Sequence, residues 1–236
     1  MMIKPNILQN INFSEVKKLF KELVRIMEKN GNYADVLLFG EKSFSISKDK
    51  IDISVDRSED LGVKLRVFDG EKFNVRSITG INKQKLLSLA QELGSLNKLF
   101  TIKFKIDKSK ISKHFSSKGK INALSVPISN KVNFISNLQK KVVNSDNKII
   151  NARVLYMEDN ETRIFVNRYK SLSYEINFCY LAVMPFILSD NKDVRYHYKG
   201  FFSPGYEVTK IKKKDFDKLI KMSLAISRAG KIVSGK

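Results

Sequence analysis

Residues with catalytic or ligating side chains are few in this chain and lie far apart. There are two histidines, His114 and His197, and a single cysteine, Cys179. Neither histidine has a second His, Cys or carboxylate at the spacing of metal ligands, and the motifs HExxH, HExxxH and Cys-x-x-Cys do not occur. We therefore interpret His197 as a surface histidine on a strand and His114 as one in a lysine-rich loop. Cys179 lies in an aromatic and apolar stretch, which favours a buried, inert thiol over a nucleophile.

The tightest acidic group consists of Asp56, Glu59 and Asp60. These carboxylates could bind a cation, but the other oxygen ligands of a calcium loop are missing, so a turn before Gly62 is favoured. Gly62 is interpreted as a close-packing or bulge glycine. The motifs GxxxxGK[ST], GxGxxG and GxSxG do not occur either. The sequence therefore assigns no catalytic, cofactor-binding or metal-binding residue to this chain.

The chain is strongly basic, with 44 Lys and Arg against 24 Asp and Glu, a formal net charge of +20 and a pI near 9.9. Such a charge is typical of nucleic-acid-binding proteins. The densest lysine runs, 103–120 and 210–214, have no interleaved aromatic residues at the spacing of a base-stacking platform. Lys, Ile and Asn are abundant and are all favoured by AT-rich codons. A compositional origin of the charge is therefore favoured, with a functional basic surface as the alternative, and 212–214 is interpreted as a solvated helix start.

The 236 residues, 42% of them hydrophobic, are enough for one large or two small domains with a real core. No apolar run has the length of a membrane span. The first residues lack the apolar region of a secretory signal, and a single cysteine fits a reducing compartment. We therefore expect a cytoplasmic protein without a membrane partner.

Hydrophobic periodicity predicts an opening helix over 16–27, with Ser14 as its N-cap and a stop at Asn30-Gly31. Strands are predicted at 34–39, 43–47, 51–55, 62–68 and 73–78. Asp69-Gly70 is a hairpin-turn signal between the last two strands, and a second helix ends near Gly94. The following segment, 98–130, is rich in lysine and serine, with a predicted strand at 101–106 and an exposed loop at 116–120.

The same order of elements then returns. A helix is predicted over 132–143, followed by strands at 149–157, 162–167, 172–187 and 194–202, a turn at Pro204-Gly205 and a last helix over 216–226. Hairpin-length links dominate, and long crossover helices are missing. The expected fold class is therefore α+β, with mainly antiparallel sheets, flanking helices and two helix–five strand–helix repeats of architecture.

This pattern predicts a division of the chain in sequence order. The N-terminal α+β subdomain is expected at 1–107 and a lysine- and serine-rich linker at 108–130. The second α+β subdomain is expected at 131–236.

Several short motifs carry a resemblance to a known family. Tyr33-Ala34-Asp35-Val36 follows the opening helix, then comes the acidic stretch and "GVKLRV" of 58–67, then "DGEKF" of 69–73 and a helix. This order resembles the N-terminal domain of the TldD/PmbA family, bacterial and archaeal proteins once called modulators of DNA gyrase. In that family a helix precedes "YADV", an acidic stretch, "GVGVRV", a short hairpin and a second helix. For Tyr33 and Asp35 a structural role is favoured, with Asp35 alternating outward from its neighbours.

The second half is similar to the family more loosely. Residues 151–154 and 163–167 look like the family's strands "V…ASY" and "R.V.I.NS.G", and 227–235 looks like the tract before its C-terminal domain. The resemblance spans most of 14–235 and leaves 98–130 unmatched.

The resemblance implies a metalloprotease built from two related subunits, one of which carries a zinc motif HExxxH in its C-terminal half. Peptide and toxin-antitoxin substrates are processed inside the assembled chamber. Known members are about twice as long as this chain, and the helix with the zinc motif would begin beyond Lys236. Zinc is therefore expected only in the missing C-terminal half, and this chain is expected to be inactive alone.

Three hypotheses follow. The leading one is a non-catalytic N-terminal half of a TldD/PmbA-like cytosolic metalloprotease with a docking or chamber-forming role, encoded as a truncated or split-gene product. Its expected partners are a TldD/PmbA-type subunit or a separately encoded C-terminal half, and peptide substrates of the assembled protease. The alternative is a free-standing basic nucleic-acid-binding protein. The third is an enzyme in its own right.

Overall fold

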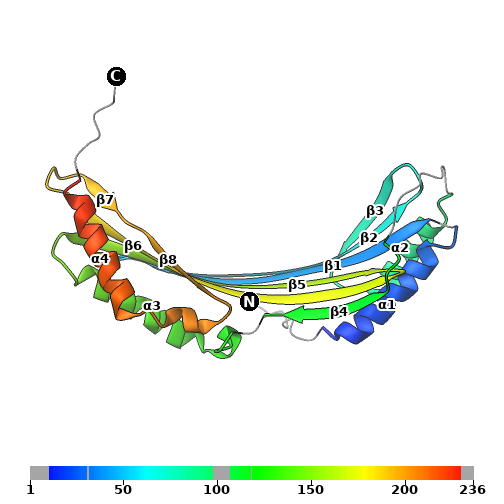
Figure 1. Cartoon of the computed structure of the whole chain (residues 1–236), viewed down its shortest axis with the longest axis horizontal. Coiled ribbons are helices and arrows are strands. Elements are labelled where there is room, and N and C mark those ends of the chain that lie inside the picture. Colours follow the sequence, from blue (N-terminus) through cyan, green and yellow to red (C-terminus); the bar gives the residue numbers. More distant parts are fainter. Residues whose placement is uncertain (1–10, 31, 98–106, 118, 230–236) are drawn as a thin grey trace, which may run out of the picture. The chain divides into compact units, whose positions relative to one another are not determined.

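The computed structural model describes residues 11–30, 32–97, 107–117 and 119–229, and Figure 1 shows their helices and strands in chain order. The elements are α1 (Phe13–Met27), β1 (Tyr33–Lys48), β2 (Ile53–Phe68), β3 (Phe73–Thr79), α2 (Lys83–Gly94), β4 (Ile111–Ser116), η2 (Ala123–Ser125), α3 (Ile128–Val143), β5 (Ile149–Asn167), β6 (Lys170–Leu188), β7 (Val194–Tyr196), β8 (Lys199–Ser203), η3 (Tyr206–Thr209) and α4 (Lys213–Ser227). The strand predicted at 101–106 lies outside the described residues.

The strands belong to a sheet with the order β3-β2-β1-β5-β6-β4, and β7 and β8 also pair with β6. The pairs β2·β3, β6·β7 and β6·β8 are antiparallel, whereas β4 runs parallel to β6. The predicted α+β class with mainly antiparallel pairing is confirmed.

Three strands are longer than predicted, whereas the single strand predicted at 194–202 is divided into β7 and β8. The segments predicted at 34–39 and 43–47 form the single strand β1, those at 51–55 and 62–68 form β2, and those at 149–157 and 162–167 form β5. In β1 the buried apolar positions are even-numbered both before and after Gly40, so the alternation of faces continues unbroken. Backbone pairing inside the sheet outweighs the weak strand propensity of the Gly and charged residues between the predicted segments. Three strands, rather than five, therefore lie between α1 and α2 in the described residues.

The turn predicted at Asp69-Gly70 joins β2 to β3, with Phe68 opposite Phe73. Gly70 has a φ of 106°, which a residue with a side chain rarely adopts. The carboxylate of Asp69 accepts hydrogen bonds from the backbone N–H groups of Glu71 and Lys72, both at 3.0 Å. These hydrogen bonds lower the pKa of Asp69.

The chain forms two compact units, and each takes segments from distant parts of the sequence. Unit 1 comprises Met1–Lys42, Ser58–Ser117 and Asn160–Ile176, and unit 2 comprises Ser43–Arg57, Lys118–Asp159 and Asn177–Lys236. The strands β1, β2, β5 and β6 each contribute residues to both units. The units therefore interleave along the chain, whereas the divisions predicted at 1–107, 108–130 and 131–236 follow the sequence order.

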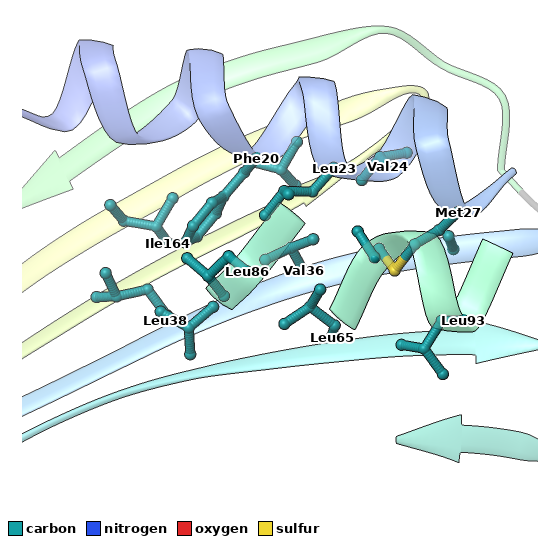
Figure 2. Packing of buried hydrophobic residues seen from close by; sticks show 14 of the residues in the cluster. Phe20, Leu23, Val24, Met27, Val36, Leu38, Leu65, Leu86, Leu93 and Ile164 are labelled. Atoms are coloured by element: carbon teal, nitrogen blue, oxygen red, sulfur yellow. The ribbon is translucent and has the colours of Figure 1, made fainter. Parts of the chain in front are cut away.

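The core of unit 1 lies between its helices and its strands (Figure 2). The labelled residues come from α1, α2, β1, β2 and β5: Phe20, Leu23, Val24, Met27, Leu86, Leu93, Val36, Leu38, Leu65 and Ile164. The N-cap of α1 is Asn12 rather than the predicted Ser14, because the Asn12 side chain accepts from the backbone N–H groups of Ser14 and Glu15. The helix ends at the C-cap Glu28, before the predicted stop.

The core of unit 2 lies between the helices α3 and α4 and one face of the strands. Its buried members on β6 are Cys179, Leu181, Val183 and Ile187, all at odd-numbered positions of the strand. The helices supply apolar residues such as Ile135 and Leu219. Because strand side chains alternate between faces, the residues between these positions point to the opposite face of the sheet, which we call the outer face.

Candidate interaction surface

The two motifs of 33–36 and 58–67 meet in a buried ion pair in unit 1. Asp35 is fully buried, and Arg66 binds both of its carboxylate oxygens, with Nε–Oδ1 at 2.7 Å and Nη2–Oδ2 at 2.9 Å. The Arg66 guanidinium also lies 5.3 Å from the centre of the Phe73 ring. The hydrogen bonds to Asp35 raise the pKa of Arg66. Asp35 thus faces away from Ala34 and Val36 as predicted, but it is enclosed rather than exposed, because Arg66 covers it.

Tyr33 occupies a structural position beside this pair. The Asn167 amide donates a hydrogen bond of 3.3 Å to the Tyr33 hydroxyl, and the Asn167 side-chain oxygen accepts from the backbone N–H groups of Tyr169 and Lys170. Burial raises the pKa of the Tyr33 hydroxyl. Tyr33 therefore contacts the turn between β5 and β6, which fits the structural role that was predicted for it.

Sequence reasoning missed a buried polar cluster in unit 2. Lys131 of α3 forms an ion pair with Glu158 of β5, and both side chains are almost completely buried. The Tyr156 hydroxyl donates to Glu158 at 2.7 Å and lies 3.9 Å from the Cys179 sulfur. Burial raises the pKa of the Cys179 thiol to about 11, so the thiol is protonated near neutral pH. Cys179 is buried, as predicted, and the cluster encloses it in the core.

The two histidines occupy separate places. His114 lies on β4, not in a loop, because β4 pairs with the start of β6. Its Nδ1 is 2.9 Å from the hydroxyl of Ser173 on β6. His197 lies between β7 and β8, where its backbone N–H donates to the carbonyl of Pro185. Within the described residues, no group of three or more His, Cys, Asp or Glu side chains could hold a metal ion.

The acidic group lies on a strand, which corrects the predicted turn. Asp56, Glu59 and Asp60 are all in the middle of β2, whose backbone continues to Gly62 without a break. Gly62 is a close-packing glycine, as predicted. A Cβ at that position would collide with the ring of Phe39 on β1.

The outer face of unit 2 carries an aromatic surface at β6, β7 and β8. We call it the aromatic face and define it by Phe178, Tyr180, Phe186, Tyr196, Tyr198 and Phe202. The strand pairing places Phe202 opposite Tyr180 and Tyr196 opposite Phe186. Their ring centres are 4.7 Å and 6.0 Å apart, and Phe178 lies 5.5 Å from Phe202. The aromatic residues therefore contact one another in two groups on one face of the sheet.

Much of the aromatic face is open to solvent. Phe202 is 65% exposed, Tyr196 60% and Tyr198 47%. The hydroxyls of Tyr180 and Tyr198 hydrogen-bond to each other. Burial, and then this hydrogen bond, raises the pKa of Tyr180 to about 12. Tyr180 is thus neutral at physiological pH.

No charged residue occupies the alternating outer positions of 178–188 on β6 or of 194–202. On β6 the remaining outer residues after Phe178 are Ala182, Met184 and Leu188, and on β7 and β8 they are Val194 and Gly200. An uncharged surface of this extent is notable in a chain with a net charge of +20. The sequence signal is the placing of Tyr196, Tyr198 and Phe202 at even-numbered positions of 194–202. A strand prediction alone does not interpret this pattern.

Comparison with solved structures supports the fold. The chain is similar to a candidate modulator of DNA gyrase from Bacteroides thetaiotaomicron, with a TM-score of 0.68 and 18% identity over 89% of this chain and 49% of that chain. For a candidate modulator of DNA gyrase from Thermotoga maritima the TM-score is 0.65 and the identity 13%, over 91% of this chain and 48% of that one. TldE from Thermococcus kodakarensis has a TM-score of 0.59 and 10% identity, over 86% and 46%.

These similarities confirm the resemblance to the TldD/PmbA family at the level of the fold. The chain spans about half the length of each of these structures. No protein-family model and no curated protein matches the sequence. Among the described helices, none has the length and apolar character needed to cross a membrane.

Proposed function

We propose that this chain is a non-catalytic, partner-binding half of a TldD/PmbA-like protease in the cytoplasm, and that it docks through the aromatic face. The observation that carries the proposal is the group of exposed aromatic side chains on the outer face of β6, β7 and β8, where the outer positions of 178–188 and 194–202 are uncharged. The centres of protein interfaces are enriched in Tyr, Phe and Met and depleted of charge. Surfaces of this kind on soluble proteins mark interaction sites.

The proposed partner is a TldD/PmbA-type subunit or a separately encoded catalytic half. Its support is the fold, which matches about half of each similar structure and leaves the other half of those proteins without a counterpart in this chain. In this proposal the partner holds the zinc ion and cleaves peptides. This chain positions the partner and contributes to the wall of the chamber.

The experiment mixes the purified chain with such a subunit and measures complex formation by light scattering after size exclusion. Phe202→Asp places a charge at the most exposed aromatic ring of the face. Phe115→Asp on β4 is the matched control, since Phe115 is 61% exposed and Phe202 is 65% exposed. We expect Phe202→Asp to weaken the complex at least tenfold and Phe115→Asp to leave it unchanged.

Two outcomes contradict this proposal. One is a complex that tolerates Phe202→Asp, and the other is a complex that both substitutions weaken equally. In both cases the aromatic face is not the docking surface.

The nucleic-acid alternative fits the structure less well. Proteins that bind single strands combine stacking rings with neighbouring cations. Here the aromatic rings occupy outer positions that lack charge, whereas the lysines of 212–214 belong to α4, which packs on the other face of the sheet (Figure 1). Preference for a nucleic-acid sequence or structure that persists at about 0.15 M salt would favour this alternative.

A further inference from the structure

A groove runs between α3 and α4 on the helical side of unit 2. Two hollows, of 630 and 440 Å³, share Phe216 in their walls. Phe134 and Leu138 line the groove from α3, four residues apart. Ile220 and Leu224 line it from α4, also four residues apart. Residues at this spacing lie on one side of a helix, so each helix presents an apolar stripe to the groove.

These stripes are not fully used by the core. The buried residues of α4 are Phe216, Leu219, Ser223 and Ser227. Ile220 and Leu224 are only half-buried, although they pack against the core cluster. The apolar floor is therefore accessible to a further side chain.

Cations surround this floor. Lys141 of α3 lies over the Phe216 ring, with its Nζ 4.3 Å from the ring centre. Lys213, Lys221 and Arg228 line the groove from α4, and Asp217 is the one acidic residue beside them in the described lining. Within the described residues none of these four cations forms an ion pair. The groove thus combines apolar contacts with an excess of positive charge.

The start of α4 adds to this charge. Its N-cap is Lys212, without a capping hydrogen bond from a side chain, and Lys213 and Lys214 follow it, with Asp215 as the acidic residue of the first turn. Cations are unfavourable at this end of a helix, because the helix dipole is positive there. An anionic partner beside Lys213 would offset the repulsion.

We propose that this groove binds an acidic amphipathic helix of a partner protein. The partner would place apolar residues at spacings of three and four on the floor and carboxylates beside Lys141, Lys213, Lys221 and Arg228, as in helix-in-groove recognition. The 15 residues of α4 extend over roughly 22 Å at 1.5 Å per residue, which is about four turns of a bound helix. The groove favours a peptide over nucleic acid, because its Phe216 ring is buried and lies beneath Lys141, so that it does not offer a free face for a base to stack on.

The test uses three labelled helical peptides and fluorescence anisotropy with the full chain at 0.15 M salt. The first carries a leucine stripe flanked by glutamates. The second has lysines in place of the glutamates, and the third has serines in place of the leucines. The first peptide is expected to bind at least tenfold more tightly than either of the others.

Two double variants locate the site. Lys213→Glu with Lys221→Glu changes two cations of the groove and is expected to weaken binding of the first peptide at least tenfold. Lys214→Glu with Lys218→Glu is the matched control, because it makes the same change of charge at exposed positions of α4 that do not line the groove. It is expected to change the affinity less than threefold.

Several results would overturn the proposal. Equal binding of the lysine peptide shows that charge plays no part, and equal binding of the serine peptide shows that the apolar floor plays none. Equal losses in the two double variants show a response to net charge alone. Single-stranded DNA or anionic vesicles that displace the peptide at equal concentration show a general polyanion site. The aromatic face is a separate surface from this groove. Phe202→Asp is therefore expected to leave the affinity for the first peptide unchanged.

Discussion

Aromatic residues on the outer face of the sheet have different surroundings in the two units. In unit 1, Tyr33, Phe68 and Phe73 surround the ion pair between Asp35 and Arg66. In unit 2 the rings of the aromatic face contact one another, and three of them are about half exposed or more. The first face satisfies its own polar groups. The second leaves aromatic rings exposed at uncharged positions, which is the basis of the proposed docking surface.

The largest effect is expected where charge is buried most completely. In Lys131→Met the carboxylate of Glu158 loses its cation while it stays in the core of unit 2. We expect the free energy of unfolding to fall by about 3–5 kcal/mol, as measured by urea denaturation. The Tyr156 hydroxyl still donates to Glu158, but a neutral donor does not balance the charge.

The double variant Lys131→Met with Glu158→Leu serves as the control. Replacing both partners of a buried pair by apolar residues removes the unpaired charge, so most of the lost stability is expected to return. A double variant no more stable than Lys131→Met would show that packing, not charge, causes the loss.

Asp35→Ala tests the ion pair of unit 1. Asp35 is fully buried, but its partner Arg66 is about one third exposed and can turn to water. The expected loss is therefore smaller, about 2–3 kcal/mol of unfolding free energy. Glu92→Ala breaks the ion pair with Arg76, whose side chains are both about half exposed, and should cost no more than about 1 kcal/mol. Equal losses in the two variants would mean that burial does not distinguish these pairs.

A smaller effect is expected from Glu207 in unit 2. Its burial tends to raise the pKa, but hydrogen bonds from Ser203 and the backbone of Ile121 and Lys120 outweigh this and lower the pKa to about 2. A carboxyl with a depressed pKa stabilises the fold above its ordinary pKa near 4.5, and this stability is lost as the pH falls towards about 2.

Glu207→Gln removes this contribution. Its unfolding free energy should be lower than that of the unchanged chain at pH 7, and the two should converge as the pH falls from about 4.5 to about 2. Denaturation at a series of pH values measures the difference. Parallel curves for the two proteins would show that Glu207 does not contribute in this way.

The smallest effect is expected on the aromatic face itself. Phe201 and Phe202 are neighbours on β8, but Phe201 packs against the core and Phe202 is exposed on the outer face. Phe202→Asp should change the unfolding free energy by no more than about 0.5 kcal/mol, whereas Phe201→Asp should cost about 2–4 kcal/mol. Thermal and urea unfolding measure both. A large loss in Phe202→Asp would show that the face stabilises the isolated chain.

Much of the fold could be predicted from periodicity. The apolar stripe of α1 and the turn at Asp69-Gly70 depend on neighbouring residues, and both predictions were confirmed. The prediction divided each of the long strands β1 and β2 into two, because Gly40 and the acidic group of β2 have weak strand propensity. The unchanged parity of the apolar positions on the two sides of Gly40 already indicates one strand.

The interaction surface could not be predicted in the same way. The aromatic face depends on β7 and β8 pairing with β6, which brings Phe202 beside Tyr180 from 22 positions earlier in the chain. Likewise, the burial of Asp35 depends on Arg66, a residue of the neighbouring strand. Contacts between segments that are distant in the sequence determine both the aromatic face and the burial of Asp35. Local propensity therefore does not predict either of them.

The most direct test of the central claim is hydroxyl-radical footprinting of the chain with and without a TldD/PmbA-type subunit. Oxidation of Tyr196, Tyr198 and Phe202 is expected to fall on complex formation, because a docked partner would exclude solvent from these rings. Phe115 of unit 1 is as exposed as these residues and is expected to keep its reactivity. Protection of Phe115 with unchanged oxidation of the aromatic face would contradict the account.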